Sequence, residues 1–184
     1  MIVIGARGFA KEVLEVLHQL DDLDNLVFFD DVNSDAPEKL FGKFPVLRTI
    51  QEASNYFKNI DKRFTIGIGN PLMRKQLYEK FSTIGGEFTA TISPNATIGS
   101  YDVYLGKGIN LLTGVILSNS ITIGNGCIIY YNSIITHDTI IGDFVEISPN
   151  VILLGRVEIG SYSQIGTNAT ILPDVIIGQN VIVA

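Results

Sequence analysis

Residues 121–147 read ITIGNGCIIYYNSIITHDTIIGDFVEI, and a branched aliphatic residue recurs in them at every sixth position. The series continues on both sides without a break, through Leu105, Leu111, Leu117, Ile123, Ile129, Ile135, Ile141, Ile147, Leu153, Ile159, Ile165, Ile171, Ile177 and Val183. A glycine also recurs every eighteen residues, from Gly106 to Gly178. A period of six fits neither an α-helix nor an alternating strand. We therefore expect a solenoid with three short strands and three corners in each eighteen-residue coil.

The corners of such a solenoid need residues that tolerate left-handed backbone angles, which favours Gly and Asn. One corner breaks this pattern, because its stacked positions are Asn119, His137, Gly155 and Pro173. The next column along carries Ser120, Asp138, Arg156 and Asp174. Coils lie about 4.8 Å apart, so we expect the charged residues of this second column to be able to pair.

The N-terminal half has a different pattern. A short apolar strand at residues 1–4 precedes the turn Gly5-Ala6-Arg7-Gly8, a helix over residues 9–20, and a second strand at residues 26–29. This order predicts a βαβ unit, and a further strand and helix are expected at residues 64–68 and 71–81. The turn is not the G-x-G-x-x-G fingerprint, because Arg7 occupies the place of its second glycine. The turn nevertheless leads into a helix, and its backbone N–H groups lie at the start of that helix, where phosphates bind.

The repeat resembles that of hexapeptide-repeat acyltransferases, which fold as left-handed parallel β-helices. The stretch ITHDTIIGDFVEISPN (Ile135–Asn150) resembles a narrower group within them. That group contains nucleotide-sugar N-acetyltransferases and sialic-acid-type O-acetyltransferases with an N-terminal βαβ domain. The resemblance covers nearly the whole chain. It implies an α/β Rossmann-like domain at residues 1–91, followed by an all-β left-handed parallel β-helix at residues 92–184.

The resemblance also implies a function, namely transfer of an acetyl group from acetyl-CoA to the amino group of a nucleotide-linked amino sugar in surface glycan biosynthesis. The N-terminal domain would hold the nucleotide. The substrate-binding residues carried over from the family are Gly5, Gly8, Asp30, Asp31, Gly69, Asn70 and Arg74. Relatives continue past the position of Ala184 with further coils and a tail that contacts coenzyme A, so we expect the C-terminal coils to be truncated.

His137 is the one histidine within the repeat. A histidine can take a proton near neutral pH, and a sugar amine must lose a proton when it is acylated. The family motif therefore implies His137 as the general base, against the alternative of an ordinary corner residue. Asp138 either orients this imidazole or pairs with Arg156, and both roles are open at this point. The backbone N–H of Gly155 is the candidate donor to the thioester oxygen of acetyl-CoA.

Flat solenoid faces and the resemblance together predict a homotrimer. Candidate exposed residues for its interfaces are Tyr130, Tyr131, Phe144 and Tyr162. The net charge of −6 argues against a nucleic-acid partner. No apolar run is long enough to cross a membrane, and no signal peptide is visible, so we expect a cytoplasmic protein. The single Cys127 excludes an intramolecular disulfide.

Other functions fit less of the chain. O-acetylation of a sialic-acid-type sugar is the runner-up among enzymes, and a non-catalytic scaffold that binds a nucleotide sugar would differ by not binding acetyl-CoA. A γ-type carbonic anhydrase shares the β-helix but needs three histidine ligands for each zinc ion, whereas the repeat contains only His137. A dehydrogenase would use Asp30 for a ribose, but the glycine pattern is wrong for it.

Overall fold

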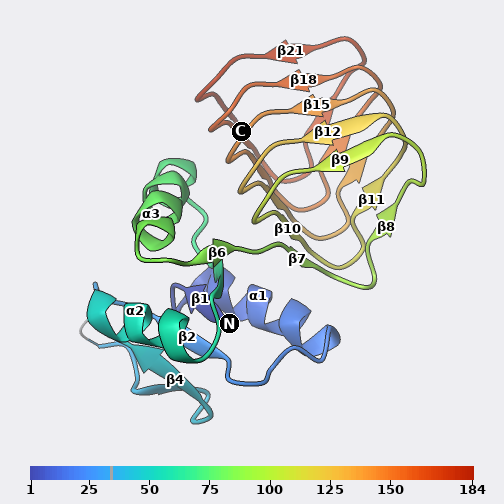
Figure 1. The fold of residues 1–184 in the computed structure, drawn as a ribbon. Helices are drawn as coiled ribbons and strands as arrows, with labels where there is room; N and C mark the ends of the chain where they lie inside the picture. Colours follow the sequence, from blue (N-terminus) through green and yellow to red (C-terminus); the bar gives the residue numbers. More distant parts are fainter. Residues whose placement is uncertain (34) are drawn as a thin grey trace. The chain divides into compact units, whose positions relative to one another are not determined.

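The computed structural model describes residues 1–33 and 35–184 and divides the chain into two compact units, Met1–Thr89 and Ala90–Ala184 (Figure 1). The second unit begins two residues before the position expected from the sequence. Thr91 already pairs with Asn110 in the first solenoid strand, which explains the difference.

The N-terminal unit has an α/β fold, in which helices pack against a mostly parallel sheet. Its elements in chain order are β1 (Ile2–Ile4), α1 (Gly8–Gln19), β2 (Val27–Phe29), β3 (Lys39–Leu40), β4 (Phe44–Leu47), α2 (Ile50–Asn59), β5 (Arg63–Ile66), α3 (Pro71–Thr83) and β6 (Glu87–Phe88). The strand order is β3-β4-β2-β1-β5-β6, and only β3 and β4 are antiparallel. The chain thus runs outward from β1 in both directions, which places a topological switch point between β1 and β5.

Local sequence explains where the helices begin. Thr49 and Glu52 form a capping box at the start of α2. Asn70 caps α3, and Pro71 occupies its first turn, where a missing N–H costs nothing. In α1 the apolar spacing of Ala10, Val13 and Leu17 buries one face of the helix.

The sheet has an aromatic core on the face that packs against α2 and α3. Phe81 lies at its centre, with its ring centroid 4.9 Å from that of Phe29 and 5.8 Å from that of Phe64. Both edge-to-face and tilted pairs occur, and such pairs add to the burial of their area. Helix α1 covers the opposite face, toward which Val3 and Phe28 point by strand alternation.

The C-terminal unit is a left-handed parallel β-helix, as the resemblance implied (Figure 1). Its two- and three-residue strands form three parallel sheets: β7 (Thr91–Ile92), β10 (Asn110–Leu111), β13 (Ile128–Ile129), β16 (Glu146–Ile147), β19 (Gln164–Ile165) and β22 (Ile182–Val183); β8 (Thr97–Ile98), β11 (Ile116–Leu117), β14 (Ile134–Ile135), β17 (Ile152–Leu153) and β20 (Thr170–Ile171); and β9 (Val103–Leu105), β12 (Ile121–Ile123), β15 (Ile140–Ile141), β18 (Glu158–Ile159) and β21 (Ile176–Ile177).

The period-six aliphatics fill the interior of this β-helix. From Leu111 to Ile165 their exposed fraction is at most 2%. Strand partners lie eighteen residues apart from β9 onward. They lie nineteen apart for β7 and β8, because one extra residue is accommodated between Ile98 and Val103. In both cases apolar positions pair with apolar positions, as Leu111 does with Ile92 and with Ile129, so they face inward in every coil.

The glycine column from Gly106 to Gly160 has a different cause from the one expected. These glycines do not have positive φ; that angle is found at the third residue of each corner, as at Asp138 (58°) and Arg156 (62°). Instead, a Cβ on Gly124 would lie 2.6 Å from the backbone carbon of Gly142 in the next coil. Close stacking of coils therefore requires glycine here.

The aromatic residues expected on open faces lie at corners instead. Phe144 is only 4% exposed, because its ring stacks on that of Tyr162 at 6.0 Å and covers Gly126. Tyr130, Tyr131 and Tyr162 are partly buried. Phe144 is therefore not available as an exposed contact residue.

Candidate functional site

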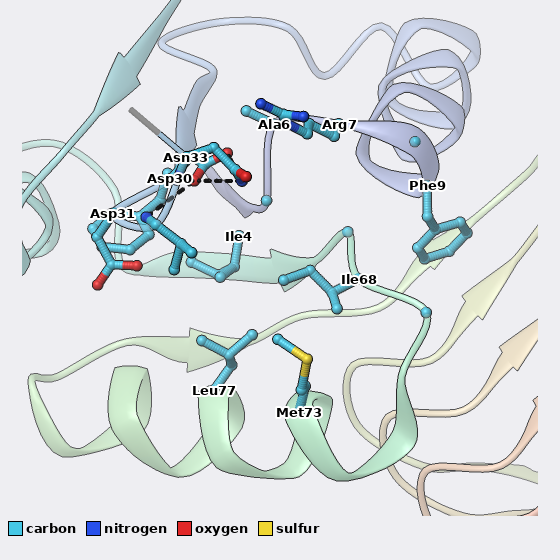
Figure 2. A pocket seen from close by; sticks show the side chains of 16 residues that line it. Ile4, Ala6, Arg7, Phe9, Asp30, Asp31, Asn33, Ile68, Met73 and Leu77 are labelled. Atoms are coloured by element: carbon cyan, nitrogen blue, oxygen red, sulfur yellow. Dashed lines mark hydrogen bonds between the residues drawn. The ribbon is translucent and has the colours of Figure 1, made fainter. Parts of the chain in front are cut away.

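A cavity of about 440 Å³ opens in the N-terminal unit at the carboxyl ends of β1, β2 and β5. Three segments form most of its wall: the turn Gly5–Gly8, the loop Asp30–Asn33, and residues 67–69. Figure 2 shows Met73 and Leu77 reaching it from α3 on the side opposite Ala6 and Arg7. The cavity thus lies at the switch point of the sheet, where open α/β sheets bind their ligands.

The glycine turn is shaped for close approach. Gly5 has a φ of 107°, and a Cβ there would lie 2.9 Å from the carbonyl oxygen of Gly67. A Cβ on Gly8 would meet nothing within 4 Å, so the start of α1 is open. No side chain caps α1, and its first turn has no acidic residue. The positive end of the helix dipole is therefore left for an external anion.

Asp30 organises the loop after β2. One of its carboxylate oxygens accepts hydrogen bonds from the backbone N–H groups of Val32 (3.2 Å) and Asn33 (2.9 Å). The Asn33 amide donates to both oxygens, at 3.0 and 2.9 Å (Figure 2). Burial by itself raises the pKa of Asp30, but these hydrogen bonds outweigh it and hold the pKa below its ordinary value. Asp30 therefore fixes the loop as an ionised carboxylate.

Arg48 supports the same loop from behind. Its guanidinium donates to the carbonyl oxygens of Asp30 and Asn33, both at 3.0 Å, and also to those of Ala36 and Pro37. A second hollow of about 400 Å³ borders this side of the loop. The loop is thus a thin wall held by side-chain contacts on one side and facing the first cavity on the other.

The structure brings five of the expected substrate residues to the cavity wall. They are Gly5, Gly8, Asp30, Asp31 and Gly69. Asp31 also pairs with Lys80 at 2.9 Å. The wall, within the described part of the chain, does not include Asn70 or Arg74. Asn70 caps α3 through Met73 N–H, and the fully buried Arg74 donates to the carbonyl oxygen of Gly69.

Sequence reasoning missed other wall residues, among them Arg7, Asn33, Ile68, Met73 and Leu77. Arg7 was noted only as a departure from the glycine fingerprint. Its position between two turn glycines was the available signal. The apolar residues of α3 gave no signal, because core-facing and cavity-facing positions of a helix follow the same spacing.

A second candidate site lies on the β-helix, at the corner between β14 and β15. His137 is 56% exposed there, and its Nδ1 lies 2.7 Å from a carboxylate oxygen of Asp138. The Thr139 hydroxyl donates across the corner to the carbonyl oxygen of Thr136 at 2.8 Å. The imidazole packs on the next coil at Gly155, where a Cβ would lie 2.5 Å from Cε1 and 2.8 Å from Nε2. Glycine is therefore the residue that leaves room for this ring.

The charged residues beside His137 make two separate contacts, one within their own column and one with the imidazole. Arg156 binds both carboxylate oxygens of Asp174, at 2.5 and 2.8 Å. This pair raises the pKa of Arg156 and lowers that of Asp174. Asp138 instead contacts the Nδ1 of His137, so of its two expected roles the geometry favours contact with the imidazole. The arrangement leaves Nε2 as the ring nitrogen that can exchange a proton with a bound molecule.

In the described residues there is no group of three His, Cys, Asp or Glu side chains that could hold a metal ion. The helices of residues 1–33 and 35–184 are also too short or too polar to cross a bilayer. Cys127 is buried, with its sulfur 3.0 Å from the carbonyl oxygen of Gly142, as expected for a core position.

Two family models match the chain. Residues 1–81 match the PglD N-terminal domain, and residues 138–171 and 156–184 match the bacterial transferase hexapeptide (six repeats). Comparison with curated protein sequences gives no match.

Several solved structures share the whole architecture. The acetyltransferase domain of PglB from Neisseria gonorrhoeae is 28% identical, with a TM-score of 0.88 over 98% of this chain and 86% of that one. The same domain is also known in complex with acetyl coenzyme A. A histidine-to-alanine variant of GDP-perosamine N-acetyltransferase from Caulobacter crescentus, in complex with CoA and GDP-perosamine, is 25% identical. Its TM-score is 0.81, over 100% of this chain and 87% of that one.

Proposed function

This chain is a hexapeptide-repeat acyltransferase with an N-terminal domain of the PglD type, and on that premise we propose that it acetylates the amino group of a nucleotide-linked amino sugar. Acetyl-CoA is the acetyl donor, and the product serves surface glycan biosynthesis. The observation that carries the proposal is the exposed His137–Asp138 pair on a solenoid corner, with Nδ1 and the carboxylate 2.7 Å apart. The PglB and GDP-perosamine relatives support the reaction class.

The proposed chemistry needs one base. The acceptor amine attacks the carbonyl carbon of the thioester, and His137 takes the proton that the amine loses. The carbon–sulfur bond then breaks, and coenzyme A leaves as a thiol after receiving that proton. Asp138 holds the imidazole with Nδ1 protonated and stabilises its charged form. The Gly155 backbone N–H is our candidate donor to the oxygen on which negative charge develops.

The N-terminal cavity is the proposed nucleotide site. Its support is the combination of an uncapped helix start at Gly8, an ordered loop at Asp30–Asn33 and apolar walls from Ile68, Met73 and Leu77. Backbone N–H groups suit a phosphate, and apolar walls suit a base or ribose. Asn70 and Arg74 take supporting roles beneath this wall.

The test of the catalytic assignment is the acetyl-transfer rate against pH. We expect His137→Ala to lower turnover by about a hundredfold to ten-thousandfold, the range for loss of a general base. The loss should shrink at high pH, where more of the acceptor amine is already neutral. His18→Ala, which removes the other histidine, is the matched control. If His137→Ala keeps most of its rate at neutral pH, His137 is only a corner residue.

The role of Asp138 has its own matched control on the same column. Asp138→Asn should slow acetyl transfer by less than His137→Ala does, because the base stays in place but loses its orienting partner. Asp174→Asn removes an equal charge from the pair with Arg156 and should leave the rate unchanged. Equal losses in the two variants would argue against a specific role for Asp138.

The runner-up reactions are separated by the same assays. Acetylation of sugar hydroxyls but not of amines would indicate an O-acetyltransferase. Binding of nucleotide sugars without binding of acetyl-CoA would indicate a non-catalytic scaffold. A cytoplasmic location is part of the proposal, because acetyl-CoA and nucleotide sugars are found there.

We also propose a homotrimer, which rests on an apolar stripe outside the β-helix. Ile116, Ile134 and Ile152 stack in register on the outer surface of one sheet, and Ile116 is 43% exposed. A threefold arrangement would cover this stripe on every copy. Ile134→Glu should lower the mass measured by light scattering to that of a monomer. A monomeric wild-type protein at micromolar concentration would refute the trimer.

A further inference from the structure

Arg7 is the cationic residue on the wall of the N-terminal cavity, within the described residues. It is the N-cap of α1 in an extended conformation, and its side chain makes no capping hydrogen bond to the helix. Its guanidinium instead forms an ion pair with Asp35, in the segment that follows the Asp30–Asn33 loop. The ion pair therefore joins the turn that follows β1 to the segment that follows β2.

This ion pair is weakly held. The Arg7 and Asp35 side chains are 54% and 77% exposed. Ion pairs with such exposure contribute little to stability, because water screens the charges and two long side chains must be ordered. The neighbouring acids are committed elsewhere: Asp30 accepts from Asn33, and Asp31 pairs with Lys80. Asp35 is therefore the anion that competes for Arg7.

We propose that Arg7 is the residue that selects a nucleoside diphosphate, and that the diphosphate replaces Asp35 as its partner. A guanidinium matches phosphate oxygens through paired hydrogen bonds. Arg7 is followed directly by the start of α1 at Gly8, where no side chain caps the backbone N–H groups and the surface is open. A diphosphate can contact both groups at once, whereas a monophosphate reaches one of them. The inference rests on the proposed function and narrows it to acceptors activated as diphosphates.

The test compares nucleotides by isothermal titration calorimetry. Uridine, guanosine, thymidine and adenosine diphosphates are titrated first, and the tightest is then compared with its own monophosphate and nucleoside. In the wild type the diphosphate should bind tightest. Arg7→Gln should weaken diphosphate binding by about tenfold to a hundredfold, the effect of a lost charged hydrogen bond. Nucleoside binding should not change.

Asp35→Asn should change the affinity for the diphosphate in the opposite direction. Removing the competing anion should tighten diphosphate binding by about twofold to fivefold at low salt, the scale of an exposed ion pair. The gain should vanish in the Arg7→Gln background, because no cation is left to be released. Lys11→Gln, which removes a cation from the same helix away from the cavity wall, is the matched control and should change nothing. Thermal melts of all variants check that each is folded.

Several outcomes overturn the inference. Unchanged diphosphate binding in Arg7→Gln, or a monophosphate that binds as tightly as the diphosphate, removes the selective role of Arg7. Unchanged diphosphate binding in Asp35→Asn would show that the diphosphate does not replace Asp35 as the partner of Arg7. Absence of binding by any of the four diphosphates overturns it as well. Failure of the proposed function looks different: diphosphates would bind and depend on Arg7, while no acetyl transfer would occur.

Discussion

The two units of the chain relate sequence to contact in opposite ways. In the β-helix a strand pairs with the strand one coil away, and Ile128, for example, pairs with Glu146. In the N-terminal unit the central strand pairs with distant segments, as Ile2 does with Phe64. A site on the β-helix is therefore an exception to a repeat, as His137 is. A site in the N-terminal unit is assembled from strand ends that no repeat connects.

The sharpest test of this contrast is truncation of each core. Phe81 is fully buried among Phe29, Phe57 and Phe64. Phe81→Ala should lower the free energy of unfolding of the N-terminal unit by about 3–5 kcal/mol. Circular dichroism should then show the helical signal lost at a lower temperature while the β signal persists.

Ile129→Ala is the counterpart in the β-helix. It should lower the stability of that unit by about 2–5 kcal/mol and affect the β signal first. Both variants unfolding in one shared transition would show that the two units are a single cooperative structure, and the contrast would fail.

Gly155→Ala sharpens the contrast at the site. The new methyl group would meet the His137 imidazole at 2.5 Å, so the ring must move. A displacement of this size should lower kcat by about tenfold to a hundredfold, with a small change in Tm. Gly178→Ala is the control, because a Cβ there meets its nearest atom only at 3.8 Å. A normal kcat in Gly155→Ala would show that the position of the ring is not critical.

The smallest expected effect is on acid stability, and it belongs to the N-terminal unit. Burial raises the pKa of Asp61, but hydrogen bonds from Arg63 and the Met1 amino group outweigh it and lower the pKa from 3.8 to about 2. Because the folded pKa lies below the unfolded one, this stabilisation is complete above about pH 4 and is lost as pH falls toward 2.

We expect the ionised Asp61 to contribute about 1 kcal/mol to the free energy of unfolding at neutral pH, after solvent screening. Urea unfolding of the N-terminal unit at pH 7, 4 and 2.5 should show it, and Asp61→Asn should remove that part of the acid loss. Asp24→Asn, at an exposed aspartate, is the control. An unchanged acid limb in Asp61→Asn would contradict the assignment.

The same contrast explains what the sequence could predict. The coils of the β-helix were predicted, because from β9 onward the partner of each strand is found by counting eighteen residues along the chain. The burial of Phe144 at its corner was not predicted. In the N-terminal unit the strand–helix order was predicted, but the β3–β4 hairpin was not, since Lys39–Leu40 is too short to carry a pattern. Gly5 and Gly69 were expected at the substrate site from the family resemblance, and both line the cavity because they follow the carboxyl ends of neighbouring strands. The burial of Arg74 was not predicted, because packing decides where a helix side chain points.

Because the coils share one register, the β-helix can be lengthened or shortened without disturbing its core only by whole coils. Loss of one residue inside a strand would turn its inward side chains outward, whereas the one extra residue between Ile98 and Val103 is absorbed at a bend. Removal of eighteen residues would keep every side chain on its own face and shift all later coils by about 4.8 Å. The position of the His137 corner along the β-helix axis can therefore change only by whole coils, in steps of about 4.8 Å.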